Sequence, residues 1–354
     1  MKKQCNLLIL LVLIPFLGFS NTNDFTFVKQ KSIKKAYFVN LDAGLNIDNS
    51  YGTIFVTTWD EDKIELDILI KVSGDRENWV NERINDINVD IIALKGLISA
   101  KTVIANSSSK YKGKNNSFEI NYIVKIPKNG SVKLNNKYGN ITTNDLFANT
   151  DINCKYGKIN LGKLNGNRNA ILMQYCTDSS IDFLKNGTVN AKYSEIKIGE
   201  VVKLDLISDY TDVVIQESGD VKYLSKYGTI KIQNVNSLDA SGNYLTIKIG
   251  SVFNQLRLNT KYSNVGISSI NAKANNIAIV AGYSGISIGY QPNYFFDFNV
   301  SVKYADFKYD SDLDIYSKEE NNNSKVYSGF NKKKGINNLS VISDYGNVSL
   351  TKKQ

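Results

Sequence analysis

Alternating carboxylates on one short stretch have the clearest chemical spacing in this 354-residue chain. Asp310, Asp312 and Asp314 are two residues apart, so in an extended strand all three would lie on one face. Carboxylate oxygens gathered in this way are the ligands that Ca²⁺ prefers. However, no glycine completes a calcium-binding loop in this stretch, and a solvated loop is the simpler interpretation. We therefore predict no metal site and keep these three residues as weak candidates for one.

The absence of histidine removes whole classes of catalytic site. Without histidine, Ser-His and Cys-His nucleophilic centres and histidine-ligated zinc are excluded. The sequence also contains neither a G-x-x-x-x-G-K-[ST] phosphate loop nor a dinucleotide fingerprint. We therefore predict no cofactor and no enzymatic activity.

Carboxylates and basic side chains remain able to carry out acid–base chemistry on a polysaccharide. A lyase or hydrolase of this kind needs these groups on one face of the fold. The sequence offers two scattered sets: Asp178 and Asp182 with Arg168, and Asp205 with Asp209 and Asp212. A polysaccharide lyase or hydrolase is therefore the alternative function.

The elements that would position such groups follow from a tyrosine that recurs every 17 to 21 residues between Tyr138 and Tyr304. A typical copy is VKYLSKYGTIKI at 221–232, in which apolar residues alternate on both sides of the tyrosine. Each half therefore predicts a short strand with one buried face. The copies contain Tyr51, Tyr138, Tyr156, Tyr175, Tyr193, Tyr210, Tyr227, Tyr244, Tyr262, Tyr283, Tyr304 and Tyr345.

A repeat this short cannot bury its apolar face alone, so the copies must stack on one another. We predict an all-β chain, a parallel β-helix or β-solenoid with rungs of 17–21 residues. A sandwich of up-and-down hairpins is the alternative that the periodicity leaves open. Glycine follows the tyrosine in five copies, which predicts a left-handed backbone or a bulge at that glycine.

Stacked rungs would bring the tyrosines into a ladder along one edge. Such a strip could bind sugar rings or peptides, or it could be a structural corner with its hydroxyls at the solvent edge. The tyrosine is tied to the repeat and not to one patch of the surface. This favours the structural corner.

Two cysteines, Cys154 and Cys176, belong to neighbouring repeats. The first lies two residues before a tyrosine and the second one residue after the next tyrosine. Because this offset places them out of register between rungs, two buried free thiols are favoured over a disulfide.

The N-terminus predicts export. Lys2 and Lys3 precede an apolar run from Leu7 to Phe19, and the small residues Gly18 and Ser20 suit a signal peptidase that cleaves after Ser20. We expect the mature chain in the periplasm, on the outer envelope surface or outside the cell, without a transmembrane helix.

The repeat pattern changes at both ends of the chain. Residues 75–88 predict the one short helix, with Ser73 or Asp75 as its cap. The predicted division is a signal peptide at 1–20, an end module at 21–130, the repeat solenoid at 131–309, a protruding loop or hairpin at 310–338, and the final rung with the C-terminus at 339–354.

The segment from 48 to 130, together with the repeats, resembles the bacterial putative-adhesin family of secreted β-solenoid domains. The resemblance is carried by Tyr51-Gly52-Thr53-Ile54, by Trp59-Asp60-Glu61-Asp62, by the strand that ends at Pro127 and by the serial Tyr-Gly-x-Ile copies. It implies a cell-envelope protein with an adhesive or binding role, and it transfers no catalytic residues.

The predicted function is therefore an exported, non-enzymatic β-solenoid that binds a glycan, the envelope or a protein surface. A structural or regulatory envelope component is a second alternative, beside the lyase or hydrolase. The formal net charge of +9 could attract nucleic acid, but lysines that alternate outward along strands explain it as well, and no nucleic-acid partner is expected.

Overall fold

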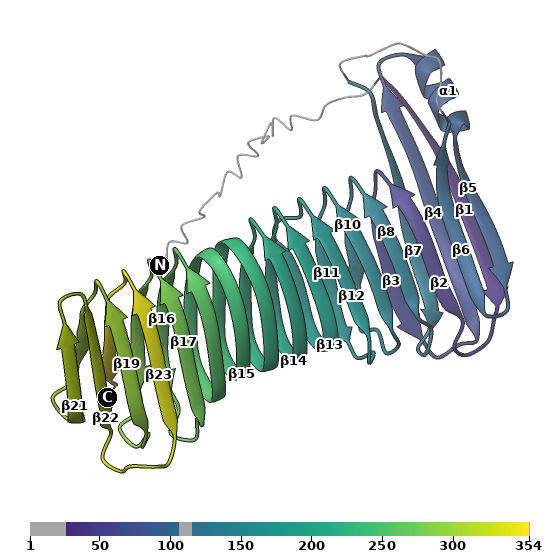
Figure 1. Cartoon of the computed structure of the whole chain (residues 1–354). Helices are drawn as coiled ribbons and strands as arrows, with labels where there is room; N and C mark the ends of the chain where they lie inside the picture. The colour runs from purple at the N-terminus through teal and green to yellow at the C-terminus, as the bar shows by residue number, and fades with distance from the viewer. Residues whose placement is uncertain (1–25, 106–114, 354) are drawn as a thin grey trace, which may run out of the picture.

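The computed structural model describes residues 26–105 and 115–353. These residues form an elongated stack of strands with a taller group of strands at its N-terminal end (Figure 1). The predicted signal peptide and its cleavage site lie outside the described residues. The one helix has ten residues, and no helix of the described segments has the length and apolar character that crossing a membrane requires.

The described residues contain 24 strands and one helix. All the strands belong to a single continuous sheet. The N-terminal part comprises β1 (Phe27–Phe38), β2 (Gly44–Ser50), β3 (Ile54–Trp59), β4 (Lys63–Gly74), α1 (Glu77–Asp86), β5 (Ile87–Leu94), β6 (Leu97–Ile104) and β7 (Ser117–Pro127). The middle comprises β8 (Val132–Lys137), β9 (Ile141–Thr143), β10 (Thr150–Lys155), β11 (Ile159–Leu164), β12 (Asn169–Gln174), β13 (Ser179–Lys192), β14 (Glu195–Asp209) and β15 (Asp212–Lys261). The C-terminal part comprises β16 (Asn264–Ile270), β17 (Asn276–Gly282), β18 (Gly285–Tyr290), β19 (Asp297–Lys303), β20 (Phe307–Tyr309), β21 (Asp314–Asn321), β22 (Ser324–Phe330), β23 (Asn338–Asp344) and β24 (Val348–Lys352).

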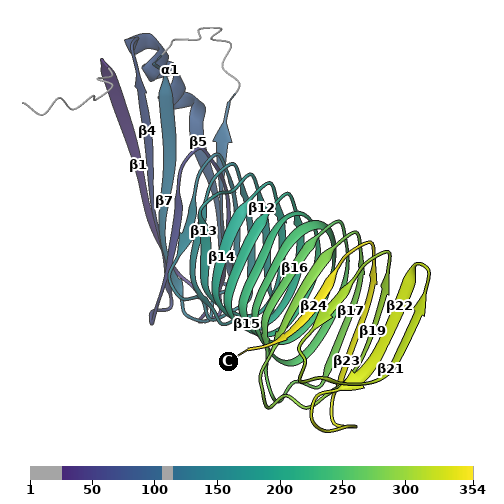
Figure 2. The same ribbon diagram turned by 90° about the vertical axis from the view of Figure 1, so that its left-hand side faces the viewer.

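Successive repeats stack as coils, and we name each coil by its tyrosine. Strands before the tyrosine pair in parallel from coil to coil, as β8 with β10 and β10 with β12. Strands after the tyrosine do the same, as β9 with β11 and β11 with β13. The coils therefore present two layers of strands, which Figure 2 shows at an oblique angle. The all-β prediction is confirmed, and the parallel pairing rules out a sandwich of up-and-down hairpins.

Apolar side chains form columns between the two layers, because strict register keeps equivalent residues above one another. Leu134, Ile152 and Ile171 are paired in this way across three coils and all are buried. β-branched residues dominate such columns, since they pack well on a pleated surface. The core is thus a continuous strip along the whole stack.

Each coil turns at its tyrosine, and the tyrosine itself has the left-handed backbone. All twelve corner tyrosines have φ between 48° and 61°. The following glycine has a positive φ in two copies, Gly52 (158°) and Gly228 (146°), so the prediction holds there, but it did not place the left-handed backbone at the tyrosine. A non-glycine residue rarely adopts this conformation unless its surroundings compensate for the strain, and here neighbouring rings cover each tyrosine.

The glycine after the tyrosine allows the backbones of neighbouring coils to approach each other closely. A Cβ atom on Gly139 would lie 1.8 Å from the carbonyl oxygen of Gly52, in the coil before it. On Gly157 it would lie 2.0 Å from the carbonyl oxygen of Gly139. No side chain fits in that space, so glycine is required wherever this approach occurs.

Four of the coils without this glycine carry a serine or threonine hydroxyl at the same position, on Ser194, Thr211, Ser263 and Ser284. The backbone N–H of Cys176 donates to Ser194 Oγ at 3.1 Å, and that of Leu245 donates to Ser263 Oγ at 3.1 Å. The hydroxyl therefore satisfies a buried N–H group of the preceding coil, which would otherwise be unpaired.

The N-terminal end replaces coils by longer antiparallel strands. β4 pairs with β1 and β7, while β5 and β6 form a hairpin that joins the stack through β2. The helix α1 packs Trp79, Val80 and Ile84 on this module. It begins after Arg76, with no side-chain cap, so the prediction that Ser73 or Asp75 caps it was wrong: Ser73 is still part of β4.

The C-terminal copy does not lie at the end of the stack. β23 pairs in parallel with β17 on one side and with β19 on the other. The Tyr345 coil is therefore inserted between the Tyr283 and Tyr304 coils, although it follows both in the sequence. The copy that was predicted to be the final rung is thus last in the sequence, but it is not the last coil of the stack.

The insertion before this copy forms a hairpin that extends the sheet. β21 and β22 are antiparallel, and β22 is antiparallel to β19 at the last coil. Figure 1 shows both strands covering the C-terminal end of the stack. The expected hairpin is thus present, but it lies against the last coil and does not protrude from it.

We expect Gly139→Ala to destabilise the fold by about 3 kcal/mol or more, because its Cβ would overlap the carbonyl of Gly52. Gly285→Ala is the matched control, since no atom lies within 4 Å of its added Cβ. Urea unfolding followed by circular dichroism measures both. Equal midpoints for the two variants would contradict this account of the corner.

Buried tyrosines predict a loss of stability at high pH. Burial raises the pKa of Tyr122 to about 12, and it raises the pKa of Tyr223 further. In the unfolded chain both phenols ionise near pH 10, so above that pH the unfolded state binds fewer protons and stability falls. Each tyrosine contributes a slope of about 1.4 kcal/mol per pH unit until its folded pKa is passed.

Tyr223→Phe removes one of these buried phenols. The free energy of unfolding should therefore fall less steeply above pH 10, by the contribution of one tyrosine, as urea unfolding at pH 9 to 12 would measure. At pH 7 it should cost nothing, because the Tyr223 hydroxyl finds no hydrogen-bond partner among the described residues. Tyr122→Phe should instead cost about 1 kcal/mol at pH 7, because it removes a 2.7 Å hydrogen bond with Thr102. An unchanged slope in the Tyr223 variant would refute the assignment.

Candidate functional site

The corner tyrosines form one stack of rings along the edge of the coils. Neighbouring ring centroids are 4.5–5.1 Å apart, with angles of 2–24° between planes. Phe118 packs on the outer side of Tyr51 at 4.9 Å. The stack passes from Tyr283 through Tyr345 to Tyr304, following the insertion of the C-terminal coil.

This stack presents ring edges and hydroxyls to solvent. The tyrosines are 38–53% exposed, but each inner ring has a neighbour on both faces. A sugar ring needs an open aromatic face, and it cannot enter between rings only 5.1 Å apart at most. The geometry therefore gives the ladder little capacity to bind sugars by stacking.

The three alternating aspartates do not gather around a cation position. Asp312 pairs with the Nζ of Lys352, and Asp310 accepts a hydrogen bond from the backbone N–H of the same lysine. The contact with Lys352 lowers the pKa of the Asp312 carboxyl. Within the described residues, no three acidic, cysteine or histidine side chains are placed to hold a metal ion.

The carboxylate and arginine sets proposed for acid–base chemistry are dispersed. Asp178 pairs with Lys158, and Asp212 accepts a hydrogen bond from the backbone N–H of Thr229 at 2.8 Å. Arg168 and Asp182 line different depressions. The first set is therefore not brought together.

Asp205 lies in a depression of about 600 Å³ on the face formed by strands before the corner. Asp220, Asp239 and Arg257 also line it. In register, Lys222 lies directly opposite Asp205 on the next coil, and Lys203 lies opposite Asp220. Opposite charges at paired positions stabilise neighbouring strands. This explains why acidic and basic residues face each other here without any need for a catalytic role.

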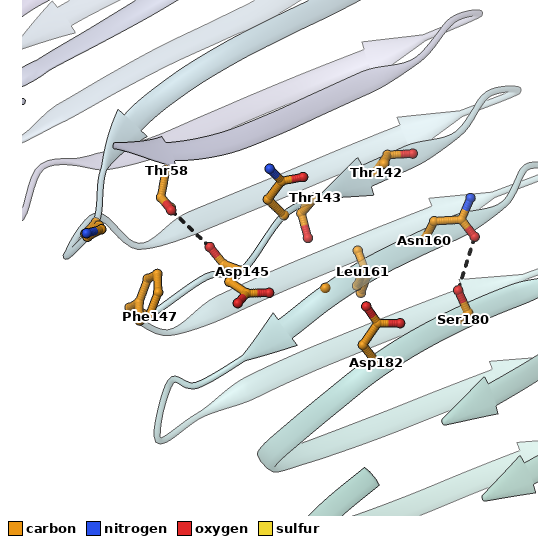
Figure 3. A pocket seen from close by; sticks show the side chains of 12 residues that line it. Thr58, Thr142, Thr143, Asp145, Phe147, Asn160, Leu161, Ser180 and Asp182 are labelled. Carbon is orange, nitrogen blue, oxygen red and sulfur yellow. Dashed lines mark hydrogen bonds between the residues drawn. The ribbon is translucent and has the colours of Figure 1, made fainter. Parts of the chain in front are cut away.

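A different groove, of about 550 Å³, crosses the face formed by strands after the corner (Figure 3). It exists because β9 ends after three residues. The backbone N–H of Asn144 donates to Val56 O of the coil before, at 3.1 Å, whereas that of Leu146 donates to Lys163 O of the coil after, at 2.8 Å. The chain therefore crosses from one coil to the next and leaves a hollow beside it.

Asp145 holds this crossing in place. Its Oδ1 accepts a hydrogen bond from the backbone N–H of Lys163 at 2.9 Å, and its carbonyl accepts one from Thr58 Oγ1 at 3.1 Å. A Cβ on Gly162 would lie 2.9 Å from the same Oδ1, so the small residue there leaves room for the carboxylate. Asp145 is thus mainly a structural member of the groove.

Neutral polar side chains line the outward side of the groove. The residue four positions after the tyrosine points outward, and in later coils it is lysine in some, as Lys197 and Lys248, and uncharged in others, as Val214 and Gly266. In the groove the same column holds Thr142 and Asn160, which are in register, followed by Ser180. Ser180 Oγ donates to Asn160 Oδ1 at 3.3 Å. Amides and hydroxyls in a row can both donate and accept hydrogen bonds.

Thr143 is a polar residue in a column that is otherwise apolar. It is paired with Val56 and Leu161, which are both buried, and is itself only 5% exposed. Its Oγ1 has no hydrogen-bond partner among the described residues. A buried hydroxyl without a partner costs free energy, so a water or a ligand hydroxyl reaching it would be stabilised.

The rim of the groove combines one aromatic ring with a carboxylate. Phe147 is 44% exposed, and Figure 3 shows it at the edge of the groove, with Asp145 and Asp182 on either side of Leu161. The lysine of the lining, Lys128, forms an ion pair with Asp60 at 2.6 Å. The charge facing the groove is therefore mainly negative.

Sequence reasoning named Asp182 but missed the rest of this groove. Thr142, Asn160 and Phe147 have no chemical motif of their own. The available signal was the threonine at position 143, an inward position that is apolar in the neighbouring coils.

No protein-family model matches this chain, and no curated protein matches it. Several solved structures do. A putative cell adhesion protein from Clostridium sporogenes is 10% identical, with 92% of this chain and 100% of that one covered and a TM-score of 0.19. A putative adhesin from Parabacteroides distasonis is 10% identical, with 90% and 97% covered and a TM-score of 0.31.

A putative lipid binding protein from Parabacteroides distasonis also matches, at 8% identity, with 91% and 97% covered and a TM-score of 0.29. Two of these three proteins are named as putative adhesion proteins. The site itself is inferred below from the geometry of this chain alone.

Proposed function

We propose that this chain is an exported, non-enzymatic β-solenoid of the putative-adhesin kind that binds a neutral glycan in the groove beside β9. The observation that carries the proposal is the row of Thr142, Asn160 and Ser180, which lines the groove and lies beside the hydroxyl of Thr143, a hydroxyl without a hydrogen-bond partner among the described residues. Export places the groove in the periplasm, on the outer envelope surface or outside the cell.

The chemistry of the lining suits a polyhydroxylated ligand. Sugar hydroxyls can donate to the exposed carboxylate of Asp182 and exchange hydrogen bonds with Asn160. The exposed ring of Phe147 offers a face for the apolar side of a sugar ring. Lys128, the lysine of the lining, is paired with Asp60, and the carboxylates of Asp145 and Asp182 would repel an anionic glycan.

The open, solvated form of the groove supports binding in preference to catalysis. An acid–base site needs groups held out of water at fixed positions on the reacting atoms. Here one carboxylate, Asp145, is occupied by the backbone of Lys163, and the other, Asp182, is exposed.

We assign the remaining parts of the chain to support of this surface. The tyrosine ladder would stabilise the corners, the module before residue 130 would close the N-terminal end of the solenoid, and the hairpin β21–β22 would close the other. Closed ends protect the unpaired strand edges that every open stack has.

A glycan array that holds neutral, amino and uronic acid oligosaccharides tests the proposal. We expect saturable binding to neutral oligosaccharides, and a loss of affinity of tenfold or more in Phe147→Ala and Asn160→Ala, measured by titration calorimetry on the best neutral hit. One lost contact of about 1.4 kcal/mol corresponds to tenfold.

Lys248→Ala is the matched control, because it lies at the same position of a distant coil and outside the groove. It should bind as the wild type does. Absence of neutral binders on the array, or affinities that the two groove variants leave unchanged while the fold is intact, would disprove the assignment.

A polysaccharide lyase or hydrolase remains the second candidate, and it is favoured by the depression that contains Asp205, Asp239 and Arg257. If it is correct, the purified chain should cleave uronic acid polysaccharides, with new reducing ends or unsaturated products, and Asp205→Asn should abolish the cleavage. We expect no cleavage by the wild type, because the charges there are already matched between coils.

A further inference from the structure

Two thiols that the sequence places out of register meet at one corner. Cys154 belongs to the Tyr156 coil and Cys176 to the Tyr175 coil, and both are fully buried. The Sγ of Cys176 lies 3.4 Å from the carbonyl oxygen of Cys154. The Cys154 Sγ lies 3.5 Å from the carbonyl oxygen of Gly139, on the same inner side of the corner.

The missing side chain of Gly157 allows this meeting. Gly157 occupies, in the Tyr156 coil, the position that Cys176 occupies in the next coil. A Cβ on Gly157 would lie 3.2 Å from the Cys154 Sγ, so any larger residue would take the space that the sulfur uses. The left-handed turn at Tyr175 then directs the Cys176 side chain back toward the preceding coil.

Another corner shows that this geometry is built into the repeat. Thr211 follows Tyr210 as Cys176 follows Tyr175, and its Oγ1 donates to the carbonyl oxygen of Ala191 at 3.2 Å. Ala191 precedes its tyrosine by two residues, as Cys154 does. The side chain that follows a tyrosine therefore contacts the preceding coil, at the residue two positions before the tyrosine of that coil. Cys176 and Cys154 are the one pair in the repeats in which both of these positions carry a thiol.

We propose that Cys154 and Cys176 are a redox site, which forms an intrachain disulfide between adjacent coils under oxidising conditions. The inference does not depend on what the groove binds. It concerns the same part of the molecule, because the two linked coils supply Asn160 and Ser180 to the lining of the groove.

The disulfide would form by two successive thiol–disulfide exchanges with a small-molecule disulfide. The Cys176 thiolate attacks one sulfur of that disulfide and releases its other half as a thiolate. The Cys154 thiolate then attacks the mixed disulfide, which forms the S–S bond and releases the second half. Two protein thiols lose two protons and two electrons, and the small disulfide gains the electrons and becomes two thiols.

The pair is suited to this order of attack. Contact between the two side chains lowers the pKa of Cys176 and raises that of Cys154, because the thiol of one donates to the thiolate of the other. Both sulfurs are buried, so the exchange occurs while the corner is open, during folding or local unfolding of these coils.

The full-length protein, unfolded and refolded with oxidised glutathione, tests the proposal. Peptide mapping by mass spectrometry should find one cross-linked peptide that joins Cys154 and Cys176 and is lighter by two hydrogens than the two reduced peptides. The oxidised protein should unfold at higher urea concentration than the same protein in dithiothreitol, because the link restricts the unfolded chain.

The matched control is Cys154→Ala with Cys176→Ser. The Tyr193 coil carries Ala191 and Ser194 at the two equivalent positions, so this variant copies residues that the repeat already accepts. It should fold, and its urea midpoint should not respond to oxidised glutathione.

Two results would overturn the proposal. One is a refolded wild type in which Cys154 and Cys176 both remain open to alkylation after denaturation. The other is a cross-link that joins either residue to Cys5 or to a second chain instead.

Discussion

The close approach of each coil to the next at the tyrosine corner is the constraint on which the rest of the structure depends. At Gly139 the backbone of the preceding coil comes so near that a methyl group would lie 1.8 Å from a carbonyl oxygen. Where glycine is missing, Ser194 or Ser263 supplies a hydroxyl to the same buried N–H groups. Both solutions keep the corner in register, and the strands on either side can then pair along their whole length.

This constraint separates the parts of each coil that are free to vary from those that are not. The inward columns must stay apolar and the corner must stay compact, whereas the outward side chains can change without cost to the stack. Lysines occupy many outward positions, which discourages association of exposed strand faces. The groove arises where β9 is only three residues long and where the outward column holds Thr142 and Asn160. It is a local change in a uniform surface.

Local pattern in the sequence predicted a large part of this architecture. Period-two alternation and the recurring tyrosine predicted the strands, their stacking and the all-β fold. Other features depend on contacts between residues far apart in the sequence. The tyrosines with a left-handed backbone stack their rings from coil to coil, and the two thiols meet where Gly157 leaves a space. Neither fact is visible in a single repeat. The groove was missed for a similar reason, since Asn160 and Ser180 become neighbours only through the pairing of β11 with β13.

The inserted Tyr345 coil ties the order of assembly to the order of synthesis. β19 has its parallel partner, β23, on the last stretch of the chain, and β23 also joins β19 to β17. A chain that has been made only as far as β22 therefore contains β19, β22 and β21, which pair with one another, but lacks the strand that joins them to the rest of the stack. The Tyr304 coil and the hairpin can join the stack only after the C-terminal residues have been made, because these residues lie between two coils that precede them in the sequence. The stack thus grows by addition along most of its length and is finished by an interior strand, so a chain cut short by some twenty residues would lose its last three layers together.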